Sequence, residues 1–121
     1  MKTKKILVVD DDPSLLELMK SFLVSRGYET ETASDGADGL EKVKSCDPDL
    51  IILDVMMPKM DGYTFIRELK KTGKLNKLSI IVLTAREMMR DMFVQEGIKD
   101  YLIKPFQPED LLEKISKCFQ P

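Results

Sequence analysis

The sequence is dominated by one repeating pattern, in which a short strand-like run is followed by a segment with the apolar spacing of a helix. The strand-like runs are 6–9, 29–33, 50–53, 80–83 and 101–103. The helical segments are 13–26, 35–45, 64–71, 87–96 and 108–119. Alternation of this kind predicts a parallel sheet covered by helices on both faces. The expected fold class is therefore α/β, a three-layer sandwich of five strand-helix units, with the more polar run 29–33 at an edge of the sheet.

Length and charge limit the kinds of protein this chain can be. At 121 residues it can bury one core without disulfides or a structural metal, and we expect a single domain over 1–121. The formal net charge of −2 and the lack of a basic run argue against direct nucleic-acid binding and against a membrane surface. No stretch approaches the roughly 18 apolar residues of a membrane-spanning helix. The first apolar run ends in acid, unlike that of a signal peptide.

Two residue types narrow the chemistry further. Cys46 and Cys118 lack the spacing of metal ligands, so we expect reduced thiols and a cytoplasmic protein. Histidine is absent from the sequence, so no histidine of this chain can be a base, a metal ligand or a phosphate carrier. Any such chemistry must use carboxylates, hydroxyls and amines.

The carboxyl ends of the strands carry polar residues, and functional groups gather at this edge of a parallel sheet. The first strand runs into Asp10, Asp11 and Asp12, and the third ends in Asp54. Asp12 precedes Pro13, which predicts that Asp12 is the N-cap of the first helix. Asp10 and Asp11 are either solvated acids near that helix N-terminus, where the helix dipole favours negative charge, or members of a site.

The expected fold places Asp54 beside Asp10 and Asp11. Two carboxylates about 5 Å apart repel by roughly 3 kcal/mol at an effective dielectric constant near 20. Three carboxylates at one end of the sheet therefore need a cation. Ligands that offer only oxygen suit a hard ion, Mg²⁺ or Mn²⁺.

Thr84 ends the fourth strand and Lys104 follows the fifth. Taken singly, the threonine is a common strand residue and the lysine an ordinary surface charge. Together with a metal ion they would neutralise the three oxygens of a phosphoryl group. Asp54 would then be a nucleophile that forms an acyl phosphate.

The stretches ILVVDDDP, LIILDVMMPKMDG, IIVLTA and DYLIKPF, in this order, resemble the receiver domains of bacterial two-component response regulators. The resemblance covers essentially the whole chain and implies a chemotaxis-receiver-like, flavodoxin-like (βα)₅ fold with strand order 2-1-3-4-5. It implies that Asp54 is the phosphoacceptor, modified by a sensor histidine kinase or a phosphotransfer protein in a Mg²⁺-dependent reaction. Asp10, Asp11 and the backbone carbonyl of Met56 would help to hold the ion.

The resemblance also implies how the signal leaves the site. Thr84 and Lys104 would bind the phosphoryl oxygens, and Tyr101 occupies the family's aromatic switch position, which turns inward as Thr84 moves. The face formed by residues 88–119 would meet a downstream protein or an output domain. The chain would be a signalling protein that catalyses only its own phosphorylation and dephosphorylation.

The fourth helical segment departs from the family pattern, because the chain between LTA and DYLIKPF is shorter than usual. Arg86 in this segment either tunes the lifetime of the phosphate or is a solvated residue at a helix start. Four large apolar residues follow, and they span too wide an arc for one buried stripe. They are Met88, Met89, Met92 and Phe93. We expect core packing to explain most of them and one or two to lie on a partner-binding surface.

Two alternatives to the switch interpretation exist. A Mg²⁺-dependent phosphatase of the haloacid-dehalogenase type would also use an aspartyl phosphate. Such enzymes usually carry a second aspartate two residues after the nucleophile, whereas Val55 and Met56 follow Asp54 here and no cap domain is available. A receiver-like module that never accepts phosphate is the other alternative, and the intact set of acids with Lys104 argues against it.

Overall fold

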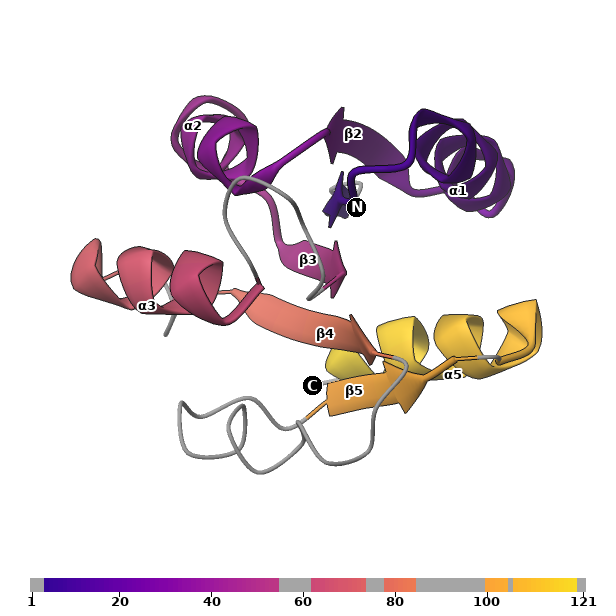
Figure 1. Cartoon of the computed structure of the whole chain (residues 1–121). Helices are drawn as coiled ribbons and strands as arrows, with labels where there is room; N and C mark the ends of the chain where they lie inside the picture. Colours follow the sequence, from indigo (N-terminus) through magenta and orange to yellow (C-terminus); the bar gives the residue numbers. More distant parts are fainter. Residues whose placement is uncertain (1–3, 55–61, 74–77, 85–99, 105, 120–121) are drawn as a thin grey trace.

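The computed structural model describes residues 4–54, 62–73, 78–84, 100–104 and 106–119, and within them five parallel strands form one sheet (Figure 1). The strands are β1 (Lys5–Val9), β2 (Glu29–Ala33), β3 (Leu50–Asp54), β4 (Ser79–Thr84) and β5 (Asp100–Ile103). The helices are α1 (Pro13–Ser25), α2 (Gly36–Cys46), α3 (Gly62–Lys71) and α5 (Pro108–Cys118). The strand order is β2-β1-β3-β4-β5. The predicted fold class, the strand order and the edge position of β2 are confirmed.

The helices form two outer layers. Figure 1 shows α2 and α3 on one face of the sheet and α1 and α5 on the other. Neighbouring residues of a strand point to opposite faces, so each central strand supplies both cores. Leu7 and Val9 of β1 join the core under α2 and α3, whereas Ile6 and Val8 join the core under α1 and α5. Burial on both faces explains why these strands are continuous apolar runs.

The apolar side chains that the helical spacing predicts to point inward do so. In α3 these are Phe65, Ile66 and Leu69, all fully buried. In α1, Leu16, Met19 and Leu23 are buried, and Leu15 and Phe22 pack half-buried against the same core. In α2, Val43 is buried and Leu40 packs against the core. The sequence pattern therefore locates the core on both faces of the sheet.

The ends of the helices differ by a residue or two from the predicted ones. Asp35 was expected inside the second helix, but it is the N-cap, and its carboxylate accepts a hydrogen bond of 2.8 Å from the Asp38 N–H. The third helix begins at Gly62 rather than Thr64. The helix expected at 87–96, with Arg86 and the apolar residues 88–93, lies outside the described residues. None of the described helices is both long and apolar enough to cross a membrane.

The strand register brings the carboxyl ends of the strands to one edge. Val9, the last residue of β1, pairs with Ala33 of β2 and with Leu53 of β3. On the other side of β3, Asp54 pairs with Leu83 of β4. Thr84, which ends β4, pairs with Ile103 of β5. The residues that directly follow these pairs therefore share one end of the sheet.

Gly39 lies where α2 packs tightly against a side chain of α3 and a side chain of β1. A Cβ atom at this position would lie 3.0 Å from Cε2 of Phe65 and 3.2 Å from Cγ2 of Val9. Glycine inside a helix costs about 1 kcal/mol relative to alanine. The missing side chain is therefore explained by packing and not by helix propensity.

We predict that Gly39→Ala lowers the free energy of unfolding by about 1–2 kcal/mol, because the cost of overpacking exceeds the gain in helix propensity. Urea denaturation of both proteins measures the change. Glu41→Gly compared with Glu41→Ala, at an exposed site of the same helix, measures the propensity difference alone. If Gly39→Ala were stabilising by the full propensity difference, the contact with Phe65 and Val9 would not limit the approach of α2.

Candidate functional site

Three aspartates meet at the carboxyl end of the sheet. Asp10 and Asp11 directly follow β1, and Asp54 is the last residue of the neighbouring strand β3. Each offers a carboxylate oxygen, and these oxygens all lie within 4.8 Å of one another. Asp10 is 2% exposed and Asp54 is 8% exposed, whereas Asp11 is open to solvent. This arrangement can hold a divalent cation with oxygen ligands from three side chains.

Asp10 is buried rather than solvated. Its backbone N–H donates to the carbonyl of Ala33 at 3.1 Å, which extends the β1–β2 pairing by one residue. Its Oδ1 atom accepts a hydrogen bond of 3.0 Å from the backbone N–H of Asp12. The main chain therefore fixes both the backbone and the carboxylate of Asp10. The alternative of a solvated acid near a helix N-terminus describes only Asp11.

Burial raises the pKa of Asp10 from its ordinary value of 3.8 to about 6. The charge of Asp54 and the contact with Asp11 raise this pKa as well, while the Asp12 N–H and the Lys104 ammonium oppose the rise. Desolvation and two neighbouring carboxyl groups thus disfavour the charged form of Asp10. A bound cation would remove this disadvantage.

Lys104 brings the opposite charge to Asp54. It follows β5, and its Nζ atom lies 3.2 Å from Oδ2 of Asp54 in a combined hydrogen bond and ion pair. The Lys104 side chain is 35% exposed, and that of Asp54 is 11% exposed. The ammonium group therefore reaches into the acid cluster from the solvent side of β5.

Asp12 is the N-cap of α1, as predicted. Its Oδ1 atom accepts hydrogen bonds from the backbone N–H groups of Ser14, at 3.0 Å, and Leu15, at 3.4 Å. Pro13 occupies the first helical position, where a missing N–H group has no consequence. Asp12 is therefore structurally distinct from Asp10 and Asp11, although the three are consecutive.

The remaining predicted site residues are described to different extents. The backbone of Thr84 ends β4, at the same edge of the sheet as Asp54. Tyr101 pairs with Val82 of β4 and packs half-buried against the core under α2 and α3. Met56, whose carbonyl was predicted to be a metal ligand, lies outside the described residues. The described geometry thus brings together Asp10, Asp11, Asp54 and Lys104.

Two features of the site were not predicted from the sequence. One is the direct ion pair between Lys104 and Asp54, because we expected Lys104 to bind phosphoryl oxygens only. The other is the hydrogen bond from the Asp12 backbone to Asp10. The sequence signal for the second was present, since an N-cap aspartate three residues after a strand limits the backbone between the two elements.

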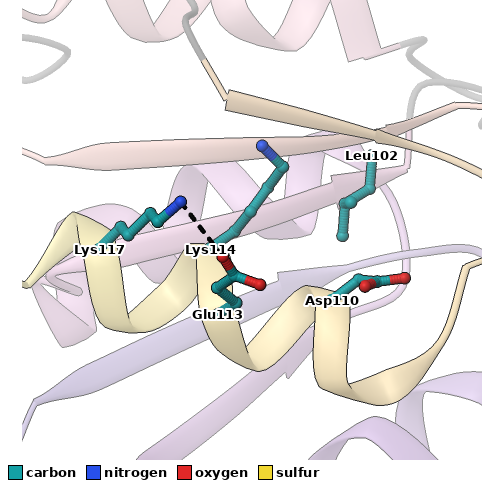
Figure 2. A pocket seen from close by; sticks show the side chains of 5 residues that line it. All are labelled: Leu102, Asp110, Glu113, Lys114 and Lys117. Carbon is teal, nitrogen blue, oxygen red and sulfur yellow. Dashed lines mark ion pairs between the residues drawn. The ribbon is translucent and has the colours of Figure 1, made fainter.

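A separate pocket of about 210 Å³ lies between β5 and α5. Figure 2 shows its lining, which combines four charged side chains along α5 with Leu102 of β5. These charged residues are Asp110, Glu113, Lys114 and Lys117. Lys117 pairs with Glu113 at 3.2 Å. None of the clustered aspartates lines this pocket, so it is distinct from the acid site.

Comparison with known proteins finds curated relatives over most of the chain. Response regulator MprA from Mycobacterium ulcerans (strain Agy99) is 43% identical over 113 residues, which are 92% of this chain and 48% of that protein. The counterpart from Mycobacterium leprae (strain TN) is also 43% identical, over 92% of this chain and 49% of its own length. The chain thus spans about half the length of the curated relatives it matches.

Solved structures show the same fold. The chemotaxis protein CheY4 of Vibrio cholerae has a TM-score of 0.90 at 32% identity, covering 98% of this chain and 100% of that one. The response regulator protein TrrA from Thermotoga maritima, solved in complex with Mg²⁺-BeF, has a TM-score of 0.85 at 38% identity, covering 97% and 100%. Residues 6–116 match the response regulator receiver domain family. With its parallel sheet and its cluster of aspartates at the strand ends, the chain belongs to this family, the receiver domains of two-component signalling systems.

Proposed function

We propose that this domain is a phosphoacceptor switch in which Asp54 accepts a phosphoryl group in a Mg²⁺-dependent reaction. The observation that carries the proposal is the position of Asp54. Its carboxylate is nearly buried, its oxygen lies within 4.8 Å of those of Asp10 and Asp11, and Lys104 contacts it at 3.2 Å. Two acids and one cation around a third acid are the groups that phosphoryl transfer to a carboxylate needs.

The donor set fits Mg²⁺, with Mn²⁺ as the alternative ion. All three clustered side chains offer carboxylate oxygen. Among the described residues, no cysteine belongs to this cluster. Asp10, Asp11 and Asp54 would hold the ion, together with the backbone carbonyl of Met56. When bound, the ion supplies positive charge that offsets the repulsion among carboxylate and phosphoryl oxygens. The TrrA protein, solved with Mg²⁺-BeF, is a receiver relative in which that combination has been seen.

In the proposed reaction, a carboxylate oxygen of Asp54 attacks phosphorus, and the bond from phosphorus to the donor breaks. The chain contains no histidine, so the phosphohistidine belongs to a sensor histidine kinase or a phosphotransfer protein. The imidazole nitrogen of the donor keeps the electron pair of the broken P–N bond. Lys104, now 3.2 Å from Asp54, would move its contact to a phosphoryl oxygen, and Thr84 would bind another. Attack of water on phosphorus then breaks the bond to the Asp54 oxygen, releases inorganic phosphate and restores the Asp54 carboxylate.

The signal would leave the site through β4 and β5. Thr84 ends β4 and Tyr101 pairs with Val82 of the same strand, so the two proposed switch residues share one strand pair. Tyr101 is half-buried and packs against the core under α2 and α3, and we propose that it turns further inward in the modified state. A movement of Thr84 toward the phosphoryl group would make room for the inward position.

We propose that the partner binds to the face formed by residues 88–119. The described part of this face contains β5 at the sheet edge and α5, with the charged pocket of Figure 2 between them. The chain spans about half of the curated regulators that it matches, so an output domain or a separate downstream protein can be the partner. We place the domain in the cytoplasm, where thiols such as the free Cys46 and Cys118 stay reduced.

The first prediction concerns the stability of the cation-free domain. Asp10 has a pKa of about 6 in the fold and an ordinary value of 3.8, so the folded state binds more protons than the unfolded state between these values. The stability that Asp10 contributes should be complete below pH 3.8 and lost as pH rises through about 6. Asp10→Asn should therefore be more stable than the parent at neutral pH, by on the order of 2 kcal/mol.

Urea denaturation across this pH range in a chelator tests the effect of Asp10. The stability difference between Asp10→Asn and the parent should grow as pH rises. Added Mg²⁺ should stabilise the parent by mass action and the variant much less. Two stability curves that run parallel over the whole range, with no response to Mg²⁺, would contradict the proposed cluster.

The second prediction concerns the phosphoacceptor. Incubation with acetyl phosphate and Mg²⁺ should add one phosphate that is labile in base, as an acyl phosphate is. Asp54→Asn should abolish the modification, because the amide is not a nucleophile of this kind. Lys104→Ala should leave modification possible and weaken the response of the partner. Intact-mass and peptide mass spectrometry measure both outcomes.

Asp49→Asn provides the matched control for the phosphoacceptor. Asp49 precedes the same strand at its opposite end, where it accepts a hydrogen bond of 2.9 Å from the Lys5 N–H, and its variant should still be modified. A phosphate found on serine or threonine would show that Asp54 is not the nucleophile. Base-stable labelling that persists in Asp54→Asn would lead to the same conclusion.

The third prediction concerns the switch itself. Beryllofluoride mimics a phosphoryl group on aspartate, so its addition with Mg²⁺ should shift the amide NMR signals around Asp54. Large shifts should also appear at Thr84, throughout 86–93 and around Tyr101. The reason is that a phosphoryl group adds roughly two negative charges, and we expect Thr84 and Lys104 to move into contact with its oxygens. Tyr101→Ala should reduce the distant shifts without reducing those beside Asp54. Shifts confined to the residues around Asp54 would mean modification without switching of the proposed face.

A further inference from the structure

Asp12 connects the acid cluster to α1 through four hydrogen bonds. Its backbone N–H donates to Oδ1 of Asp10 at 3.0 Å. Its own Oδ1 accepts from the N–H groups of Ser14 and Leu15, at 3.0 and 3.4 Å. Its carbonyl accepts the first helical hydrogen bond, 3.0 Å from the Leu16 N–H. The same residue thus holds the start of the helix on one side and the buried carboxylate on the other.

We infer that Asp12 is a positioning residue for the cation site, and that it acts through the backbone rather than through its charge. The carboxylate of Asp12 caps α1 and so fixes the backbone at position 12. The N–H of that fixed backbone then orients the carboxylate of Asp10. This inference rests on the proposed function, because it concerns the ligands of the proposed Mg²⁺ site.

The geometry of the loop supports this role. Asp10 is anchored by its N–H to Ala33 of β2, and Asp12 is anchored to the first turn of α1. Asp11 lies between these two anchored residues. The backbone of Asp12 is extended, with φ −95° and ψ 108°, and Pro13 restricts the next φ angle. Removing the cap would release the anchor that the Asp12 side chain supplies to this short segment.

The orientation of Asp10 matters because an ion needs its ligands in place before it binds. A buried carboxylate that can rotate must lose that freedom on binding, and this loss weakens the affinity. A partner that orients a metal ligand commonly contributes 10- to 100-fold to affinity, as roughly judged from substitutions of such partners. Asp12 supplies this orientation without being among the three clustered ligands.

Charge is the competing explanation for any effect of Asp12, since a fourth carboxylate near the cluster would also attract a cation. The two explanations differ in what substitutions do. Asn and Ser are good N-caps, so Asp12→Asn and Asp12→Ser remove the charge and keep the cap. Asp12→Ala removes both. Retention of affinity in the first two variants together with its loss in the third would identify the cap as the cause.

The chain contains a matched control for loss of a cap. Asp35 caps α2 with a hydrogen bond of 2.8 Å from the Asp38 N–H, in the same way as Asp12 caps α1. Like Asp12, it follows a strand of the sheet. It is not one of the clustered acids. Asp35→Ala therefore reproduces the damage to a helix without touching the proposed site.

The experiment is calorimetric titration of Mg²⁺ into the five proteins: the parent, Asp12→Ala, Asp12→Asn, Asp12→Ser and Asp35→Ala. It is run at a temperature at which thermal melts show every protein folded. We expect Asp12→Ala to bind Mg²⁺ roughly tenfold more weakly than the parent. Asp12→Asn and Asp12→Ser should stay within about twofold of the parent. Asp35→Ala should bind as the parent does, although its melting temperature falls about as much as that of Asp12→Ala.

Hydrogen exchange gives a second measurement that does not depend on the ion. The amide at position 12 should exchange faster in Asp12→Ala than in the parent, and at the parental rate in Asp12→Asn. If Asp12→Ala does not fold, Asp12→Gly replaces it, because glycine costs a helix N-terminus less and frees the backbone more.

Three results would overturn the inference. Parental Mg²⁺ affinity in Asp12→Ala would make the residue a helix cap only. Equal weakening in Asp12→Asn and Asp12→Ala would assign the effect to charge. Equal weakening in Asp35→Ala would assign it to general loosening of the fold. A parent that fails to bind Mg²⁺ would overturn the proposed metal site itself, a result that is distinguishable from the other three.

Discussion

The parallel pairing of β1 with β3 is the constraint on which the site depends. Val9 pairs with Leu53, so the next residues along the two strands, Asp10 and Asp54, must come to the same end of the sheet. The strands are held in this register by apolar side chains buried on both faces, and a shift of one residue would exchange the two cores. The energy that fixes the register therefore comes from packing of the core. The carboxylates meet because this register places them at the same end of the sheet.

Much of this arrangement could be predicted from the sequence. The features that could not be predicted depend on contacts between residues that are distant in the sequence. Continuous apolar runs followed by acids predict the sheet and the edge at which the acids meet. The N-cap role of Asp12 follows from Pro13. The sequence does not reveal that Asp10 is buried and Asp11 is exposed, because the two neighbours are the same residue type. The difference arises from the hydrogen bonds that Asp10 makes with the Ala33 carbonyl and the Asp12 N–H. Gly39 likewise has no local signal, since its reason is the approach of Phe65 from another helix.

The acid cluster makes the cation-free domain less stable than its core alone would allow. Burial and neighbouring carboxyl groups act against the charged form of Asp10, and the Asp12 N–H and Lys104 offset only part of this. Such opposition is typical of functional sites, where local interactions are not optimised for stability. A ligand that binds only the folded state then stabilises it by mass action. Binding of the proposed cation would thus be linked to folding stability through the same carboxylates.

The ion pair between Lys104 and Asp54 would connect that electrostatic balance to the proposed signalling. In the unmodified domain the ammonium satisfies the carboxylate, at 3.2 Å, while remaining partly exposed to solvent. A phosphoryl group on Asp54 would replace one negative charge by roughly two and displace the lysine outward. Lys104 directly follows β5, so in the proposed switch a new contact for its ammonium would act on the strand that carries Tyr101. To change the ratio of active to inactive domain from about 1:99 to 99:1, modification and partner binding together must favour the active state by about 5.5 kcal/mol. In the proposed switch, modification would act on β5 through Lys104 at its end, and the partner would act on β5 as the last strand of the described sheet, so both would contribute to the same change in population.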